Sequence, residues 1–179
     1  SKRPFAVAFF SPTALDTAMA YAYERSETCD VYHLVNMISP QATSDIQRRM
    51  GRGREAELQS AVALVCEIDT VTADHKQHQY PTQSIAVEAL TAMPLAPSIV
   101  NLSGRDDGGF HVYWLLDRPM HIANAATLRR GRAISKAWQA KLKSIIHPFR
   151  LDSTFDLVRV MRIAGCLNHK YESAVTRPV

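Results

Sequence analysis

Three acidic residues and one histidine stand where their side chains could act together. Glu67 and Asp69 are two positions apart at the end of an apolar run, so on a strand both point the same way. His111 lies where a glycine-rich loop becomes a second apolar run, and Asp152 follows well downstream. Carboxylates at the end of a buried strand are costly unless cations accompany them. Brought together, the three acids would make a hard-oxygen site that suits Mg²⁺ or Mn²⁺ rather than zinc.

Such a site suits phosphoryl transfer. Two divalent ions about 4 Å apart can activate an attacking hydroxyl and stabilise a leaving phosphate. Positive side chains must then hold a triphosphate, and the candidates are His111, Arg159, Arg162 and Lys170. Viewed alone, the acid pair is explained equally well by a strand end that reaches solvent, and His111 by a structural hydrogen bond. The residues by themselves leave open whether these groups meet in space.

The charge balance permits an acidic partner without requiring one. The 179 residues include 21 Lys and Arg against 17 Asp and Glu, which gives a net charge of +4 and a pI near 9.1. The basic residues gather in two clusters, Arg48, Arg49, Arg52 and Arg54 in one, and Arg129, Arg130, Arg132, Lys136, Lys141 and Lys143 in the other. Each cluster is either a solvated face or a surface that contacts a polyanion.

Other candidate metal ligands are weaker. Cys29, Cys66 and Cys166 are far apart and show no CxxC spacing, so neither zinc nor a disulfide framework is predicted, and a reducing, cytoplasmic setting fits. His75 and His78 have H-x-x-H spacing in a polar segment, which favours a surface loop over a metal site. No apolar run reaches about 18 residues, so no transmembrane helix is predicted. The chain starts at Ser1 rather than Met, which suggests a domain excised from a longer protein.

Alternating strands and helices must position these side chains. Strands are predicted over 30–38, 58–69, 97–102 and 110–116, with the last two forming a hairpin around the glycine-rich loop. Helices are predicted over 12–25, with Ser11 as cap and Pro12 at its first position, over 83–93, over 121–146, and over 152–160 with Asp152 or Ser153 as cap. Residues 39–54 are predicted to form a mobile loop. This pattern indicates an α+β fold.

Three blocks resemble motifs of the archaeo-eukaryotic primase superfamily, in particular its primase-polymerase branch of plasmids, phages and mobile elements. LVCEID (64–69) resembles the family's acid-x-acid motif, and PSIVNLSGRDDGGFHVYWLLDRP (97–119) its serine-glycine loop with histidine. LDSTFDLVRVMRIAGCLNHK (151–170) resembles its third block, with an Asp, an Arg and a later Asn-x-Lys. DVYHLVN (30–36) resembles the strand before the acidic motif. Order, spacing and flanks agree, and this combination is highly specific.

The resemblance implies one catalytic domain over residues 1–179, two lobes that share a cleft. An RRM-like antiparallel sheet would carry the acids and pack against an N-terminal α/β module. The implied activity is that of a DNA primase and polymerase, a nucleotidyltransferase that makes primers on single-stranded DNA and extends them with dNTPs, using two Mg²⁺ or Mn²⁺ ions. The implied metal ligands are Glu67, Asp69 and Asp152; the implied nucleotide contacts are Ser103, His111, Arg159, Arg162 and Lys170; and Arg129, Arg132 and Lys136 would contact the template.

The chain departs from the family pattern at several positions. Glu67 stands where Asp is usual, and Gly109 stands where many relatives have a serine two residues before the histidine. Ser103 or backbone amides could replace that hydroxyl. Asp156 competes with Asp152 as the third metal ligand, and Asp152 is favoured because Asp156 would lie one turn into the predicted short helix.

Two other classes of function compete. GGFHVYW faintly resembles the aromatic strand of RNA-binding RRM domains, but a non-catalytic RRM leaves the three acids unexplained. Another metal-dependent phosphotransferase, such as a nuclease or relaxase of a replication initiator, fits the acids, yet the His-hydrophobic-His pair of a rolling-circle relaxase is missing. A prokaryotic plasmid or phage setting and a fused or separate helicase partner are expected by analogy alone.

Overall fold

The computed structural model describes residues 6–71, 79–103, 106–170 and 174–179. In this part of the chain, five strands form one antiparallel sheet in the order β2-β3-β5-β4-β9. Their bounds are β2 Met37–Ile38, β3 Leu58–Ile68, β4 Ile99–Leu102, β5 Phe110–His121 and β9 Arg177–Pro178. The predicted α+β class and the RRM-like antiparallel sheet are confirmed. No helix among these residues is long and apolar enough to cross a membrane.

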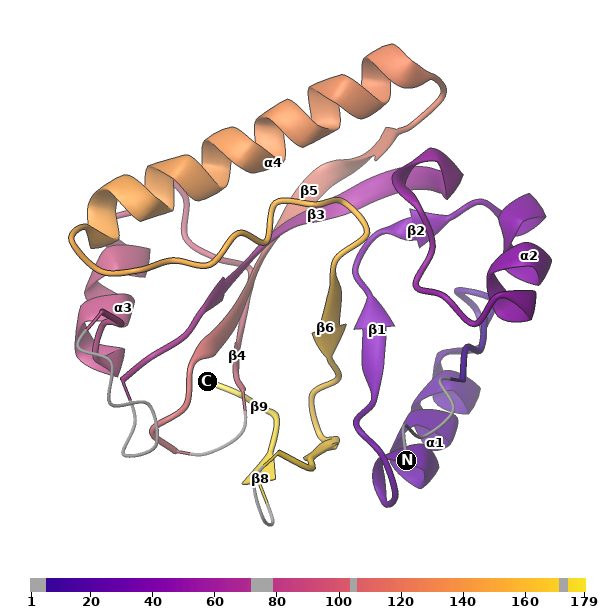
Figure 1. The fold of residues 1–179 in the computed structure, drawn as a ribbon, viewed down its shortest axis with the longest axis horizontal. Helices are drawn as coiled ribbons and strands as arrows, with labels where there is room; N and C mark the ends of the chain where they lie inside the picture. Colours follow the sequence, from indigo (N-terminus) through magenta and orange to yellow (C-terminus); the bar gives the residue numbers. More distant parts are fainter. Residues whose placement is uncertain (1–5, 72–78, 104–105, 171–173) are drawn as a thin grey trace.

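The helices α3 (Gln83–Thr91) and α4 (Ala125–Ile146) cover one face of this sheet. Their apolar residues pack with alternate residues of the strands, including Cys66 and Ile68 of β3 and Val112 of β5. Trp114 of β5 meets Trp138 of α4 edge to face, with ring centroids 5.5 Å apart. α4 runs along the sheet in Figure 1, and the β3–α3–β4–β5–α4 order is that of an RRM-like unit.

Side-chain caps determine where both helices begin. Thr82 accepts a hydrogen bond from the Ile85 amide and starts α3 close to the predicted position. Asn124 accepts hydrogen bonds from the amides of Ala126 and Thr127 and starts α4. The predicted start of this helix at His121 is wrong because β5 continues to that residue, where it pairs with Ser60 of β3.

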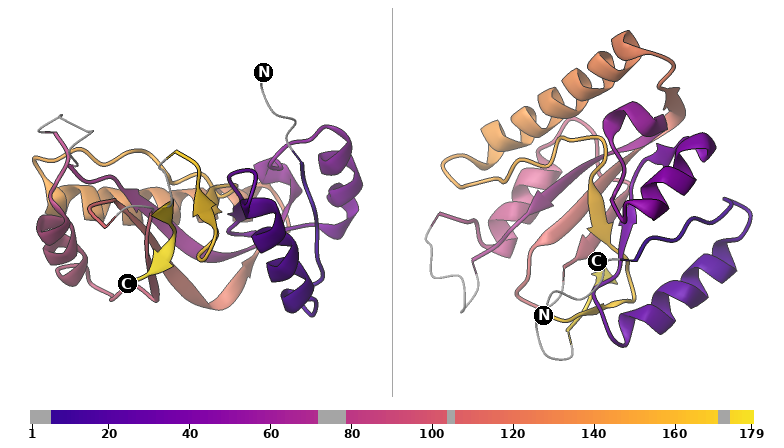
Figure 2. Two further views of the ribbon diagram at one scale, coloured as in Figure 1. Left: turned by 90° about the horizontal axis from the view of Figure 1, so that it is seen from below. Right: turned by 45° about the vertical axis from the view of Figure 1, so that its right-hand side comes forward.

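The N-terminal part forms a second unit at the opposite end of the molecule from α3 (Figure 2). It contains α1 (Leu15–Ser26), β1 (Tyr32–Leu34), η1 (Pro40–Ala42), α2 (Thr43–Arg48) and η2 (Glu55–Glu57). β1 pairs with β6 (Val160–Arg162), and short β7 (Leu167–Asn168) pairs with β8 (Ala174–Val175). Residues from the two ends of the chain therefore form one module against the sheet, and the predicted N-terminal α/β module is confirmed.

The single strand predicted over 30–38 is wrong. β1 joins β6 and β2 joins the large sheet, because the chain bends at Asn36. The buried Asn36 side chain accepts hydrogen bonds from the Val62 and Ala63 amides, at 2.8 and 3.2 Å, and donates one to the Leu157 carbonyl at 3.0 Å. One amide group thus joins the N-terminal module, β3 and the 151–159 segment.

Three further local predictions are wrong. α1 begins at Leu15, because Ser11 to Ala14 form a turn closed by a 2.9 Å hydrogen bond from the Ala14 amide to the Ser11 carbonyl. The predicted loop over 39–54 contains η1 and α2, held by the buried Ile46. No helix covers 152–160: the chain has no regular secondary structure there until a turn at 157–158 leads into β6.

Gly109 lies where β5 approaches the end of β3 too closely for any side chain. A Cβ at this position would overlap the Ile68 carbonyl oxygen and lie 3.0 Å from the Asp69 Cα. Both atoms belong to the backbone, so neither can move aside cheaply. A serine at this position, as in the motif that this block resembles, therefore does not fit this hairpin.

We expect Gly109→Ala to lower the free energy of unfolding by about 1–3 kcal/mol, the usual cost of overpacking. Urea denaturation of the two proteins measures this difference. Gly51→Ala is the matched control, because the nearest side-chain atoms to its Cβ lie at 3.7 and 3.8 Å. Equal losses in both variants would contradict the close approach at Gly109.

Candidate functional site

A row of polar side chains crosses the sheet on the face away from α3 and α4. Glu67 on β3 is paired with His111 on β5, and His111 is paired with Asn101 on β4. Their strand neighbours Cys66 and Val112 point into the helix-side core, so these three side chains point to the other face. The predicted meeting of Glu67 with His111 therefore follows directly from the strand register.

Glu67 and His111 form an electrostatic pair inside this row. His111 is 3% exposed, and its Nε2 lies 3.7 Å from Glu67 Oε1, which is long for a hydrogen bond. The His111 ring N–H lowers the pKa of Glu67 most, burial opposes it, and the positive charges of Arg159 and Arg162 lower it further. Glu67 is therefore held ionised. The other ring nitrogen, Nδ1, is buried and has no hydrogen-bond partner in the described part of the chain.

Two of the predicted arginines lie close enough to Glu67 for their charges to matter. Arg159 donates from Nη2 to the Ser153 carbonyl at 2.8 Å and pairs with Asp156 at 2.6 Å. Arg162 donates to the Tyr32 hydroxyl at 2.8 Å and lies 3.3 Å from Asp30 Oδ1. The structure thus brings Glu67, His111, Arg159 and Arg162 to one region.

Asp69 and Asp152 lie around a different pair of side chains. Asp152 Oδ1 accepts a 2.8 Å hydrogen bond from Arg150 Nε, and the Arg150 guanidinium lies 5.5 Å from the Tyr80 ring centroid. Burial raises the pKa of Tyr80, and the negative charges of Asp152 and Asp69 raise it further. Both carboxylates are therefore near the same tyrosine.

Hydrogen bonds hold the Asp152 segment against β3. Gln139 of α4 donates to the Asp152 carbonyl and to Thr154 Oγ1, each at 2.7 Å. Thr154 Oγ1 also accepts from the Glu67 amide at 3.4 Å. The third predicted acid thus lies two residues from a direct contact with the first. Among the described residues, however, no three His, Cys, Asp or Glu side chains are close enough to hold a metal ion together.

The two remaining predicted nucleotide contacts, Ser103 and Lys170, lie outside the strands that carry the polar row. Ser103 closes the β4–β5 hairpin, where its amide donates to the Gly109 carbonyl at 2.8 Å. Lys170 is exposed, and its amide donates to Asn168 Oδ1 at 3.2 Å. The H-x-x-H pair, His75 and His78, lies outside the described residues.

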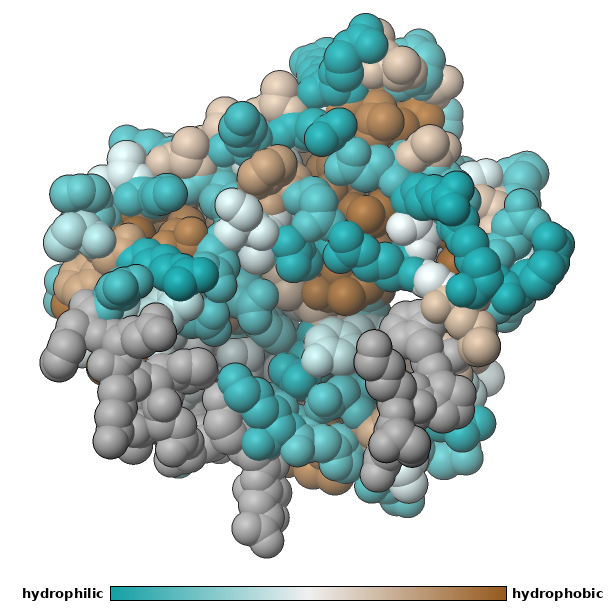
Figure 3. Space-filling model, in the orientation of Figure 1, coloured by the Kyte–Doolittle hydropathy of each residue, from teal (hydrophilic) through white to brown (hydrophobic). Residues whose placement is uncertain are grey.

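The three predicted template contacts share one side of α4. Arg132 Nε lies 3.3 Å from Glu55 Oε2 of η2, and Lys136 Nζ lies 5.9 Å from the Phe155 ring centroid. Arg129 is exposed one turn before Arg132. At Lys136 this side of α4 therefore borders the segment that carries Asp152. Hydrophilic residues cover much of the described surface in the view of Figure 3.

Two residues of the site were missed from sequence, the buried Tyr113 and the partly buried His33. His33 on β1 stacks on Tyr113 of β5, with Nε2 3.3 Å from the tyrosine hydroxyl, and Tyr113 also hydrogen-bonds Asn101. Period-two alternation along β5 could have placed Tyr113 beside His111, since they are two residues apart. Nothing local predicts that β1 lies over this face.

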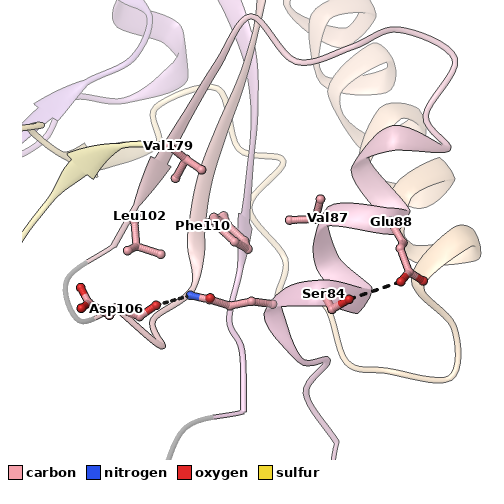
Figure 4. Close-up of a pocket in the computed structure, with 8 residues that line it drawn as sticks. Ser84, Val87, Glu88, Leu102, Asp106, Phe110 and Val179 are labelled. Atoms are coloured by element: carbon pink, nitrogen blue, oxygen red, sulfur yellow. Dashed lines mark hydrogen bonds between the residues drawn. The ribbon is translucent and has the colours of Figure 1, made fainter.

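A pocket between α3 and the β4 edge is separate from the polar row (Figure 4). Val87, Leu102, Phe110 and Val179 line it, with Glu88 and Asp106 at its polar side. Phe110 belongs to the helix-side core, so this pocket opens on the face opposite the polar row. The candidate site is the row itself and the side chains around it.

Burial makes His33 sensitive to pH. Burial lowers the pKa of His33 below its ordinary value of 6.5, and the positive charge of His111 adds to this effect. The folded protein then binds fewer protons at this residue than the unfolded chain, so the free energy of unfolding falls as the pH drops below 6.5. We expect His33→Asn to show a shallower fall. Urea denaturation between pH 5 and 7.5 would reveal it, and parallel curves for the two proteins would contradict it.

Comparison with known proteins agrees with the fold. No family model and no curated protein matches the sequence. Among solved structures, the AEP domain of cyanophage S-2L primase-polymerase (PrimPol) is similar, with a TM-score of 0.54 and 18% sequence identity. The match covers 95% of this chain and 69% of that chain. The archaeo-eukaryotic primase fold implied by the sequence motifs is confirmed.

Proposed function

From the primase-polymerase fold and the polar row upon it, we propose that residues 1–179 are the catalytic domain of a DNA primase-polymerase. The domain transfers nucleotides to a growing strand opposite a single-stranded DNA template, and it both makes primers and extends them with dNTPs. The observation that supports this most is the pairing of Glu67 with His111 beside two arginines. Phosphoryl transfer needs mainly positioning and charge neutralisation, and this row supplies acids and cations together.

The carboxylates fit divalent metal ions by their chemistry. Glu67, Asp69 and Asp152 would hold two Mg²⁺ or Mn²⁺ ions, because all three offer hard oxygen ligands and Glu67 is held ionised. When bound, such ions activate the attacking hydroxyl and stabilise the leaving pyrophosphate. Arg150, the present partner of Asp152, is 51% exposed, so water can replace it at little cost.

The cations of the site bind the incoming nucleotide. His111, held rigidly on β5, donates a ring N–H to a phosphate oxygen, and Arg159 and Arg162 add positive charge from the β6 side. Ser103 and Lys170 complete the phosphate contacts from the hairpin and from the segment after β7. Two arginines beside an ionised carboxylate keep the region from repelling a triphosphate.

The template lies along α4. Arg129, Arg132 and Lys136 share one side of α4, and Lys136 lies beside Phe155, so a strand that follows them would pass close to the segment that carries Asp152. The Arg132–Glu55 pair is more than half exposed on the arginine side, and phosphates can take the place of Glu55.

We expect Asp69→Ala to abolish nucleotide addition, because it removes a metal ligand. The partly exposed side chain makes little contribution to the core, so the free energy of unfolding should change by less than about 1 kcal/mol. A primer-synthesis assay on single-stranded DNA with labelled nucleotides and Mg²⁺ or Mn²⁺ measures the activity. Asp117→Ala is the matched control, because that side chain is fully exposed near the far end of β5.

The outcomes of this assay are distinct. Short products from wild type and Asp117→Ala alone support the proposal and the role of Asp69. If the wild-type protein extends a supplied primer but makes none, the domain is a polymerase and does not initiate primers by itself. Full activity of Asp69→Ala contradicts the assigned site. If the wild-type protein adds no nucleotide in either reaction but still binds the template, a non-catalytic nucleic-acid-binding domain is favoured.

A second measurement tests the template surface. Replacing Lys136 with Gln should lower the slope of log affinity against log salt concentration by about 0.7 for single-stranded DNA, if one phosphate contact is lost. Lys141→Gln is the control, because Lys141 lies on another side of α4. Equal slopes for Lys136→Gln and wild type would exclude α4 as the template track.

A further inference from the structure

The carboxylate of Asp156 lies between two arginines from separate parts of the chain. Its Oδ2 lies 2.6 Å from Arg159 Nη2, three residues further on, and its Oδ1 lies 3.8 Å from Arg52 Nη1. Arg52 comes from the loop between α2 and η2 in the N-terminal module. One carboxylate beside two guanidinium groups leaves these three side chains with a net positive charge. Arg159 is also close enough to Glu67 for its charge to lower the pKa of that residue.

The Asp156–Arg159 pair is largely withdrawn from water. The two side chains are 29% and 23% exposed, and Asp156 Oδ1 and Arg159 Nε are buried without a hydrogen-bond partner among the described residues. Asp45 and Arg48 on α2 make an ion pair of the same spacing, but those side chains are 65% and 77% exposed. Partial burial makes the Asp156 pair stronger and more exactly oriented than an exposed pair.

Two acceptors fix the direction of the Arg159 guanidinium. Its Nη2 group donates to the Ser153 carbonyl at 2.8 Å and forms an ion pair with Asp156 Oδ2 at 2.6 Å. Ser153 is followed by Thr154, whose Oγ1 accepts a hydrogen bond from the Glu67 amide, so the guanidinium is anchored beside the polar row. Without Asp156, the arginine would keep one backbone acceptor and gain freedom to turn toward solvent.

We infer that Asp156 is a positioning residue that holds Arg159 toward the triphosphate of the incoming nucleotide, and that it is not a metal ligand. This inference rests on the proposed function and names a residue that acts within the same site. The candidate ligand Asp152, by contrast, pairs only with the half-exposed Arg150 among its described ion pairs. The two carboxylates of the 151–159 segment therefore have separate tasks.

Two effects of removing the Asp156 charge oppose each other. Its negative charge repels a triphosphate, so its loss would favour nucleotide binding. Arg52 and Arg159 already compensate that charge, which leaves little repulsion to relieve. Loss of the oriented guanidinium removes a charge-assisted hydrogen bond to phosphate, which is the larger effect. Binding should therefore weaken.

Equilibrium binding of radiolabelled dATP with Mg²⁺ tests this. We expect Asp156→Asn to raise the dissociation constant about tenfold, the scale of one charge-assisted hydrogen bond. Arg159→Ala should weaken binding at least as much, and the double variant no more than Arg159→Ala alone, because the two residues act as a unit. Asp45→Asn is the matched control, since it breaks an ion pair of the same spacing on α2, and it should bind like wild type.

A readout of metal dependence separates positioning from ligation. The Mg²⁺ concentration that half-saturates primer extension should be the same for Asp156→Asn and wild type. A shift of that concentration would make Asp156 a metal ligand and overturn the inference. So would wild-type or tighter dATP binding by Asp156→Asn, or additive losses in the double variant.

A second variant covers the case in which Asp156→Asn does not fold. Arg159→Lys keeps the positive charge but loses the planar guanidinium, whose remaining N–H groups point in fixed directions once Nη2 is held, and it should also weaken dATP binding about tenfold. Wild-type affinity in Arg159→Lys would overturn the inference. Failure of the wild-type protein to bind dATP would overturn the proposed function. The wild-type measurement thus tests the proposed function, and the variants test the role of Asp156.

Discussion

The antiparallel pairing of β3 with β5 is the constraint on which the rest of the structure depends. Its register sets Glu67 opposite His111, and β4 extends the same row to Asn101. Because side chains alternate, a slip of one residue would move Glu67 into the helix-side core and turn Cys66 outward. Burial of Cys66 and Val112 under α3 and α4 opposes that slip. The apolar side chains on one face of the sheet therefore fix the register of the polar side chains on the other.

The parts of this arrangement that depend on local pattern could be predicted from sequence. β3, β5, α3 and α4 carry clear periodicity or caps, and the glycine-rich loop predicts the hairpin of β4 with β5. The residues themselves left open whether Glu67 and His111 meet, and only the family resemblance placed them in one site; the strand register sets them opposite each other. The assignment of Asp69, Asp152 and the basic residues to a nucleotidyltransferase site stays a prediction, as does the single-domain boundary.

The wrong predictions for residues 152–160 and 30–38 share a physical cause. In both segments, contacts with residues distant in sequence override the local preference for secondary structure. Residues 152–160 have a plausible helix cap, yet Gln139 and the Glu67 amide both hydrogen-bond Thr154 and hold the segment against β3 without a helix. The run over 30–38 is β-rich throughout, yet Asn36 joins β3 to Leu157 and breaks it in two. Residues far apart in sequence decide both outcomes, and no pattern within the segment reports them.

The last strand carries a consequence for how molecules of this protein meet one another. β9 lies outside β4 at the sheet margin, where Pro178 faces Asn101 and Val179 donates its amide to the Val100 carbonyl. Without β9, β4 would offer unpaired backbone groups to any other extended chain. Proline in this outermost strand also supplies no amide for a further strand to join. The sheet is thereby protected on this side against self-association into aggregates.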